Sequence, residues 1–380
     1  MAVTGIRSEY DLMETTFAAL SQKKNIEFSL FVTGAHLSKS HGFTIKQIIN
    51  DKYKISKKSK SLKNSNLLKS RILGISKQLK DLVQTICKVN PDLLLVTGDR
   101  EEAISTAIAG SYLNVPIAHV AGGDRVVGNI DDQIRHAVTK LSHIHFTTNQ
   151  ESYERVIKMG EQRFRVFNVG NPGIDRIFNT RKLSSKKISK LINFNIDYNE
   201  NYIILIQHPL SSEYKYAYNQ MIITLKAIKA LKIKTIIISP NSDAGNLDII
   251  RAIKEFKHLK YIYTVSHLDR EVYVNLLRNC NCLLGNSSAG ILEAPSLKIP
   301  VINVGNRQKM RLHSNNVQFV QHNANKIKRA IYKALYDKNY RKSLLNCENP
   351  YGDGKTGKKI AKILSKLKID TKLTTKDITY

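Results

Sequence analysis

The chain has 380 residues, of which 42% are hydrophobic and 24% charged, and its formal net charge at pH 7 is +29. This length suits two domains, and this composition excludes a disordered chain. No apolar stretch reaches the roughly 20 residues that a membrane-spanning helix needs, and the first residues lack the apolar segment of a signal peptide, so we expect a cytoplasmic protein with no membrane partner.

Short β-branched segments alternate with longer helical patterns, which is typical of parallel α/β sheets. In the first half the pattern predicts strands at 26–34, 92–98, 115–120, 143–148 and 165–170. A break with glycine and proline follows at 170–175. The alternation then restarts with predicted strands at 202–207, 234–240, 260–265, 282–285 and 299–305. The sequence therefore predicts an α/β protein of two doubly wound Rossmann-like domains, residues 1–172 and 173–353.

The basic residues are spread along the chain, with one dense cluster at 51–71 that mixes lysine with serine and holds one aromatic residue. A surface that stacks nucleic-acid bases needs interleaved aromatic side chains. We therefore interpret the cluster as solvated surface and expect no nucleic-acid partner. The four cysteines show no CxxC spacing, so neither a zinc site nor a disulfide framework is indicated.

Polar segments directly follow the predicted strands, and in doubly wound sheets ligands bind at this edge. In chain order they are TGIRSEY (4–10), TGAHLSKSHG (33–42), GDR (98–100), AGGDRVVGNIDDQIRH (121–136), QHP (207–209), SPNSDAG (239–245), GNSSAG (285–290) and GNRQKMR (305–311). Because so many polar segments share one rim, we expect an active-site cleft between the two domains.

The segment GNSSAG places Ser287 and Ser288 between glycines at the predicted start of a helix. Serines there can cap the helix, and the same backbone N–H groups and hydroxyls also suit a diphosphate. The carboxylate of Glu293, five residues after Ser288, can accept hydrogen bonds from a ribose diol. A nucleoside diphosphate accounts for both features, whereas helix capping accounts for the serines alone.

These motifs, together with HVAGGD (119–124), DDQIRHAVTKLSH (131–143), INVGNRQ (302–308) and NPYGDGK (349–355), resemble the hydrolysing UDP-N-acetylglucosamine 2-epimerases. These enzymes belong to the sialic-acid and legionaminic-acid pathways and to the GT-B-like epimerase superfamily. The resemblance runs from residue 3 to about residue 365 and is most specific at 98–145. It implies a GT-B-like fold whose C-terminal helix, at about 354–370, packs back on the first domain.

The resemblance also implies a reaction. Such enzymes eliminate the nucleoside diphosphate across C1 and C2 of a UDP-sugar, which leaves a glycal, and then add water with inversion at C2. The products are UDP and the free manno-configured sugar. No metal or redox cofactor is implied, and relatives form homodimers or homotetramers.

The residue types fit this chemistry. Elimination needs a base for the C2 proton, stabilisation of the departing diphosphate, and a proton donor during hydration. Asp99, Asp124 and Asp131 bring three carboxylates to one rim, where like charges raise the pKa of at least one of them. Arg135 lies four residues after Asp131 on the same helix face, so it can orient Asp131 or contact the substrate. Arg100 either pairs with Asp99 or contacts the ligand.

Two histidines complete the expected catalytic set by resemblance. His208 is expected to contact or neutralise the leaving diphosphate, and the alternative is a hydrogen-bonded residue at a strand end. His36 matches an active-site histidine of the family, and the alternative is a loop residue packed on the sheet. The residues that the resemblance places around UDP are Arg7, Asn286, Ser287, Ser288, Glu293 and Arg307. The guanidinium of Arg307 suits a diphosphate, although a surface salt bridge is the alternative.

The chain departs from the family pattern at two places. Many relatives read HGGE where this chain reads AGGD, so Ala121 replaces a histidine and Asp124 a glutamate that is one methylene longer. The shorter carboxylate alters a proton transfer unless the backbone compensates, or it marks a subfamily with a different sugar. In addition, only Met1 to Val3 precede TGIR, so we expect either a clipped first strand or a true start further upstream.

Several alternatives stay open. The sugar is N-acetylglucosamine or a 2,4-diacetamido-trideoxyhexose, and the nucleotide is UDP or GDP. A non-hydrolysing epimerase shares the fold, but its relatives carry a HVEAGLR-like block where this chain reads HVAGGDRVVG. A polyanion-binding protein explains the charge but leaves the polar strand-end segments unexplained, and its binding would weaken steeply with salt.

Overall fold

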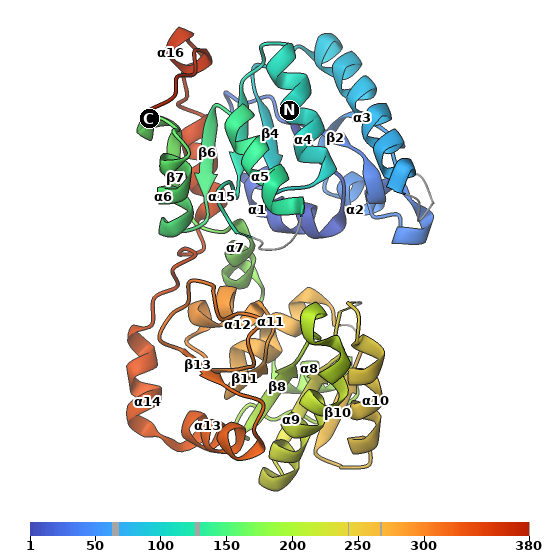
Figure 1. Cartoon of the computed structure of the whole chain (residues 1–380), viewed down its shortest axis with the longest axis vertical. Coiled ribbons are helices and arrows are strands. Elements are labelled where there is room, and N and C mark those ends of the chain that lie inside the picture. The colour runs from blue at the N-terminus through green and yellow to red at the C-terminus, as the bar shows by residue number, and fades with distance from the viewer. Residues whose placement is uncertain (63–67, 126–129, 242, 267, 380) are drawn as a thin grey trace. The chain divides into compact units, whose positions relative to one another are not determined.

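The computed structural model describes residues 1–62, 68–125, 130–241, 243–266 and 268–379. The chain divides into two compact units, one formed by Met1–Arg176 with Tyr351–Tyr380 and the other by Ile177–Pro350 (Figure 1). Each unit is a parallel sheet with helices on both faces, so the predicted doubly wound α/β class is confirmed.

The first unit is built on a parallel sheet with the strand order β3-β2-β1-β4-β5-β6-β7. The chain enters at β1, moves outward to β3, and then returns to the other side of β1 with β4. At this reversal, between β1 and β4, the crossovers leave in opposite directions, and in doubly wound sheets ligands bind at the carboxyl ends of the strands at such a point. The strands are β1 (Ala2–Thr4), β2 (Ser29–Val32), β3 (Lys54–Lys58), β4 (Leu94–Thr97), β5 (Ile117–Val120), β6 (Ile144–Thr147) and β7 (Val166–Asn168).

Helices cover both faces of this sheet because both faces are apolar. One buried cluster includes Tyr10, Phe17, Ile48 and Ile360, and the opposite cluster includes Leu82. The helices are α1 (Arg7–Ser21), α2 (Ile45–Asn50), α3 (Leu68–Val89), α4 (Glu101–Tyr112), α5 (Ile130–Leu141), α6 (Gln150–Lys158), α7 (Pro172–Asn179), α15 (Thr356–Leu364) and α16 (Thr371–Thr374).

The C-terminal helix α15 packs against α1, from the opposite end of the chain (Figure 1). A glycine allows this close approach, because a Cβ at Gly357 would lie 2.7 Å from the carbonyl atoms of Thr15. The carboxylate of Asp175 accepts hydrogen bonds from the backbone N–H groups of Thr356 at 2.9 Å and Gly357 at 2.7 Å. These bonds satisfy the first N–H groups of α15 and fix where the helix begins.

The second unit repeats the design with the strand order β10-β9-β8-β11-β12-β13. One core cluster includes Leu225, Ile249 and Ile331, and the cluster on the other face includes Ile188 and Leu276. The strands are β8 (Tyr202–Ile206), β9 (Lys234–Ile238), β10 (Ile262–Val265), β11 (Cys282–Gly285), β12 (Val301–Val304) and β13 (Val317–Val320). The helices are α8 (Ser185–Ile192), α9 (Ala217–Leu231), α10 (Asn246–Phe256), α11 (Arg270–Asn279), α12 (Ala289–Leu292), α13 (Ala324–Tyr336) and α14 (Lys338–Ser343).

Two edge strands were not predicted. Strand β3 pairs with β2 inside the lysine cluster that we interpreted as solvated surface, and β13 pairs with β12 at the other unit's edge. Neither strand contains a fully buried residue. Edge strands lack the continuous apolar run of a central parallel strand, so the sequence signal for them is weak.

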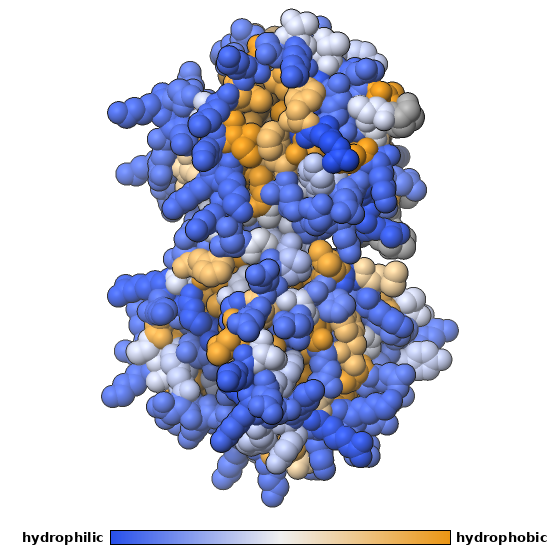
Figure 2. Space-filling model, turned by 90° about the vertical axis from the view of Figure 1, so that its left-hand side faces the viewer, coloured by the Kyte–Doolittle hydropathy of each residue, from blue (hydrophilic) through white to orange (hydrophobic). Residues whose placement is uncertain are grey.

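The surface agrees with the basic composition. Figure 2 shows one face, on which hydrophilic side chains predominate and hydrophobic ones gather in patches. Within the described part of the chain, no helix has the length and apolar character needed to cross a membrane.

Candidate active site

The first unit brings Asp99, Asp124 and Arg135 together. Asp99 follows β4 and Asp124 follows β5, and these strands are neighbours in the sheet. Arg135, on α5, donates a hydrogen bond from Nη2 to Asp99, and its Nη1 lies 3.8 Å from Oδ2 of Asp124. Nη1 also donates to the carbonyl of Ala121 at 2.9 Å. The nearly buried guanidinium of Arg135 therefore lies close to both strand-end carboxylates and offsets the repulsion between them.

The tight turn before Asp124 aims its carboxylate. Ala121 and Gly123 both have positive φ, at 63° and 79°, and a Cβ at Gly123 would lie 2.5 Å from the carbonyl oxygen of Ser152. Oδ1 of Asp124 then accepts hydrogen bonds from the hydroxyls of Thr148 and Ser152, each at 2.6 Å. These donors and Arg135 stabilise the ionised carboxylate. The shorter side chain at this position is thus matched by local hydrogen-bond donors.

Asp131 is the second residue of α5, is partly exposed, and lies about one turn before Arg135. The contacts of Arg135 described above are to Asp99, Asp124 and Ala121, so its predicted effect on Asp131 stays a prediction. Residues 126–129 of the segment AGGDRVVGNIDDQIRH lie outside the described residues.

His36 is buried inside the first unit, where it does not face solvent. Its side chain is fully buried, Nε2 lies 3.0 Å from Oγ1 of Thr4, and Nδ1 lies 2.7 Å from Oγ1 of Thr44. Burial lowers the pKa of His36 to about 4, so the ring is neutral at pH 7. This arrangement fits the alternative interpretation, a loop residue that packs on the sheet.

The two arginines of the first unit that we associated with ligand have carboxylate partners. Arg7 begins α1, is exposed, and lies 3.4 Å from Asp11. The guanidinium of Arg100 lies 3.5 Å from Glu101 and 3.4 Å from Glu102. Asp99 is instead held by Arg135, so a pairing of Arg100 with Asp99 is not what the structure forms.

In the second unit His208 and Asn286 are joined through backbone and side chain. The backbone N–H of His208 donates to Oδ1 of Asn286 at 2.7 Å, and Nδ2 of Asn286 donates to the carbonyl of His208 at 2.9 Å. Nδ1 of His208 accepts from the backbone N–H of Asn241 at 3.0 Å. Burial, and then the nearby Arg307, lower the pKa of His208 to about 4. The ring is therefore neutral at pH 7, with its proton on Nε2.

The carbonyl of Asn286 also holds the segment after β12. Arg307 donates to this carbonyl at 3.3 Å and Gln308 donates to it at 3.0 Å. Burial is the main reason that the pKa of Arg307 is lowered. Asn286 thus joins three strand-end segments of one sheet edge, after β8, β11 and β12.

The serine segment forms a shorter helix than the sequence suggested. Helix α12 covers only Ala289–Leu292, and Ser287 Oγ accepts from the backbone N–H of Ala289 at 3.3 Å, whereas Ser288 is the N-cap residue without a side-chain cap. Glu293 ends this helix and forms an ion pair with Arg270, with Nη1 at 3.1 Å and 3.3 Å from its two oxygens. A ribose diol would therefore meet a carboxylate that Arg270 already orients.

Sequence reasoning missed four polar residues at these edges. Glu9 and Glu102 are buried at the ends of β1 and β4, and Asn241 and Gln308 fix His208 and Asn286. All four lie inside or beside the polar strand-end segments. Their position was the available signal, but only the packing distinguishes them from solvated neighbours.

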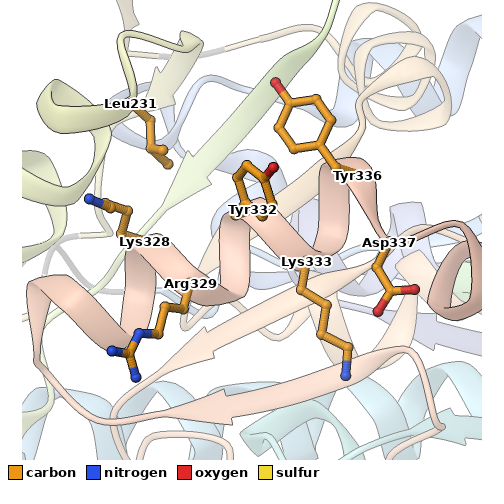
Figure 3. A pocket seen from close by; sticks show the side chains of 7 residues that line it. All are labelled: Leu231, Lys328, Arg329, Tyr332, Lys333, Tyr336 and Asp337. Carbon is orange, nitrogen blue, oxygen red and sulfur yellow. The ribbon is translucent and has the colours of Figure 1, made fainter.

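A hollow in the second unit lies away from the carboxyl ends of its strands. Its lining comes from the end of α9 and from α13, and is formed by Leu231, Lys328, Arg329, Tyr332, Lys333, Tyr336 and Asp337 (Figure 3). Leu231 lies just before β9 begins at Lys234, so this is the amino-terminal edge of the strands. The hollow is therefore separate from the strand-end residues described above.

The two units, each built on a parallel sheet, define a class of protein by fold, the two-domain GT-B-like proteins. The crystal structure of UDP-GlcNAc 2-epimerase from Neisseria meningitidis bound to UDP-GlcNAc has the same fold, with a TM-score of 0.78 over 96% of this chain and 99% of that chain, at 21% sequence identity. The family model described as UDP-N-acetylglucosamine 2-epimerase matches residues 18–365, and the chain belongs to this family. It is therefore an enzyme, a nucleotide-sugar 2-epimerase.

Two relatives are similar over most of their length. The chain is 33% identical to a hydrolysing UDP-N,N'-diacetylbacillosamine 2-epimerase of Legionella pneumophila, over 100% of this chain and 98% of the relative. It is 32% identical to a hydrolysing GDP/UDP-N,N'-diacetylbacillosamine 2-epimerase of Campylobacter jejuni, over 83% of this chain and 82% of the relative. The resemblance to the hydrolysing 2-epimerase family is thereby confirmed.

Proposed function

We propose that this enzyme hydrolyses a UDP-linked 2,4-diacetamido-trideoxyhexose, UDP-N,N'-diacetylbacillosamine, with inversion at C2. The products are UDP and the free manno-configured sugar. The arrangement of Asp99, Arg135 and Asp124 carries the reaction, because it provides an ionised carboxylate beside a cation. The 33% sequence identity to the Legionella enzyme, which extends over the full chain, supports this sugar over N-acetylglucosamine.

In the first step a carboxylate removes the C2 proton, the C2–H electron pair forms the C1–C2 double bond, and the C1–O bond breaks as UDP leaves. Asp124 suits the base, since Thr148, Ser152 and Arg135 keep it ionised and fix its direction. Asp99 holds Arg135 in place. In the second step a carboxyl gives a proton to C2 on the opposite face, water adds its hydroxyl to C1, and the other proton of the water restores that carboxyl, while the base of the first step releases its proton to solvent. We assign this proton transfer to Asp131, a second carboxyl of the same unit.

In this proposal the residues of the second unit stabilise the departing diphosphate. His208 is neutral and presents an N–H at Nε2, and Arg307 supplies a positive charge at the same sheet edge. A neutral donor together with a cation stabilises a leaving diphosphate in a site where His208 need not change its charge. Asn286 positions both, and the proposed UDP contacts also include Arg7, Ser287, Ser288 and Glu293.

The test is proton NMR of the purified protein in deuterated water with the UDP-linked diacetamido sugar. Parallel reactions use UDP-N-acetylglucosamine and the GDP-linked diacetamido sugar. We expect UDP and a free manno-configured sugar that carries deuterium at C2. A C2 epimer that stays attached to UDP would overturn hydrolysis, and turnover of UDP-N-acetylglucosamine alone would overturn the proposed sugar. Preference for the GDP-linked substrate would overturn the proposed nucleotide.

A further inference from the structure

Two buried carboxylates lie against the loop that follows β1. Glu9 is in the first turn of α1, and Glu102 is the second residue of α4. The backbone N–H of Gly5 donates to Oε2 of Glu9 at 3.1 Å. A Cβ at Gly5 would lie 1.8 Å from Oε1 of Glu102, and a Cβ at Gly34 would lie 2.8 Å from the same oxygen. Glycines after β1 and β2 thus leave the space that the carboxylate of Glu102 fills.

The carboxylates around this loop outnumber the arginines that pair with them. Arg100 lies 3.4 Å from Oε2 of Glu102 and 3.5 Å from Glu101, and Arg71 forms an ion pair with Glu101. These two arginines therefore face three carboxylates. Burial and the charge of Glu102 raise the pKa of Glu9 to about 8, and burial raises the pKa of Glu102. Glu9 is consequently protonated at neutral pH.

The ring of His36, a residue that also contacts this loop, is neutral at the same pH. His36 donates its backbone N–H to the carbonyl of Gly5 at 3.2 Å, and burial lowers the pKa of its ring to about 4. Ionisation of Glu9 above about pH 8 therefore adds negative charge at Gly5. The added charge lies beside Glu102, whose own pKa is raised by burial and whose ion-pair partner is Arg100.

These carboxylates are connected to the site through consecutive residues. Asp99 and Arg100 are adjacent in the loop after β4, where Asp99 is held by Arg135 and Arg100 by Glu102. His119 fixes the same loop from β5, because its Nε2 donates to the carbonyl of Gly98 at 2.8 Å. The direction of Asp99 thus depends on its own ion pair with Arg135, on the ion pair of Arg100 after it, and on the hydrogen bond from His119 to Gly98 before it.

We propose that Glu102 and Glu9 are positioning residues for the reaction, which hold the loop of Asp99 and Arg100 in place through Arg100 and Gly5. This inference rests on the proposed function. A carboxylate pair is a poor choice for packing alone, because apolar residues of similar volume stabilise a buried site at least as well. A misplacement of about 1 Å at a reacting group is enough to cost about a hundredfold in rate.

The test compares three substitutions of a carboxyl by an amide of the same shape. Glu102→Gln removes the partner of Arg100, and Glu9→Gln removes the proton that titrates near pH 8. Glu161→Gln is the matched control, since Glu161 is a buried carboxylate of the same unit that bonds to His145 at 3.0 Å and Lys140 at 2.9 Å and has no contact with the loop of Asp99 described here. Each variant is measured for kcat, KM, the pH profile of kcat and Tm.

We expect Glu102→Gln to lower kcat about tenfold or more while KM changes less than about threefold, because the loop and not the substrate contact is altered. The wild-type kcat should fall above about pH 8, and Glu9→Gln should remove this fall. Glu161→Gln should lower Tm and leave the pH profile unchanged. Wild-type kcat and pH profile in both Glu102→Gln and Glu9→Gln would overturn the proposal, as would the same changes in the Glu161→Gln control.

A second measurement separates this inference from the proposed function. If the wild-type protein turns over no nucleotide sugar, the proposed function fails. Infrared spectroscopy at neutral pH still tests the pair, because the carbonyl stretch of a buried protonated carboxyl should be present in the wild type and in Glu161→Gln and weaker in Glu9→Gln. Its absence in the wild type would overturn the protonated state of Glu9 and with it the role of the pair.

Discussion

Arg135 on α5 donates a hydrogen bond to the carboxylate of Asp99, which lies 36 residues earlier in the chain at the end of β4. The same guanidinium approaches Asp124 after β5. Two carboxylates at neighbouring strand ends are thus fixed by one cation that the sheet order brings between them. The chemistry of this edge depends on that cation, because it sets the charge and the direction of both acids.

Arg135→Gln should therefore lose both activity and stability. The side chains of Arg135 and Asp99 are 9% and 17% exposed, so we expect the free energy of unfolding to fall by about 1–3 kcal/mol, below the range for a fully buried pair. We expect kcat to fall by about a hundredfold. Denaturant unfolding and steady-state kinetics measure these effects. The control is Arg251→Gln, which removes an exposed ion pair with Asp248, and equal effects in both variants would contradict the special role of Arg135.

Asp131→Asn should abolish turnover while UDP still binds. An amide cannot transfer the proton that hydration requires, but it leaves the groups of the second unit that are proposed to hold UDP unchanged. Calorimetric titration with UDP and an NMR assay of turnover check both halves. Asp132→Asn is the matched control on the next residue of α5 and should keep most of the activity. Wild-type turnover in Asp131→Asn would refute a catalytic role.

Asp124→Glu should lower kcat about tenfold or more, although it restores the glutamate that many relatives carry. The extra methylene moves the carboxylate away from the hydroxyls of Thr148 and Ser152, which both bond to Oδ1 at 2.6 Å. Kinetics of Asp124→Glu next to Ser152→Ala checks this, since the second variant removes one donor and keeps the carboxylate. A more active Asp124→Glu would show that the local donors do not match the shorter side chain.

The central fold was predictable because buried parallel strands carry long apolar runs, and their polar carboxyl ends mark the edge where the candidate site lies. Asp99, Asp124 and Arg135 were singled out in this way, and the structure brings these three together. The edge strands β3 and β13 were missed because half-exposed strands lack such runs.

The partners of single side chains were harder to predict. Glu293 looked available to a ribose, but Arg270, 23 residues earlier in the chain, pairs with it. His36 matched an active-site motif, yet two threonine hydroxyls occupy its ring nitrogens inside the protein. In the segment GDREE no periodicity distinguishes the buried Glu102 from Glu101, because the difference arises from the glycines of two other loops. Such contacts depend on tertiary packing, which local patterns do not encode.

Asn286→Ala should weaken UDP binding and lower stability. The variant leaves the backbone N–H and C=O of His208 without their side-chain partner, which costs about 1–3 kcal/mol for buried groups. Because the side chain of Asn286 holds the backbone of His208, while Arg307 bonds to its backbone carbonyl and is kept, we expect the affinity for UDP to fall about tenfold. Asn275→Ala is the control, since Asn275 is buried in the same unit and bonds to the backbone of Leu183 and Arg181. It should lose similar stability and keep its affinity for UDP.

The stability of the protein should fall as the pH falls below 6.5. Burial lowers the pKa of four histidines from 6.5 to about 3 for His119 and about 4 for His36, His143 and His208. Below pH 6.5 these histidines therefore bind protons in the unfolded chain but stay neutral in the folded chain, so stability falls as the pH falls.

The carboxyl of Glu9 acts in the opposite direction. Its pKa is raised from 4.5 to about 8, so the folded state holds a proton that the unfolded chain releases, and stability falls as the pH rises towards 8. Between pH 4.5 and 6.5 the four histidines outweigh Glu9, so stability falls as the pH falls through this range. Differential scanning calorimetry from pH 5 to 9 should give a Tm that falls below pH 6.5, and Glu9→Gln should remove the destabilising contribution of Glu9 as the pH rises towards 8. A Tm that stays constant between pH 5 and 6.5 would contradict neutral buried histidines.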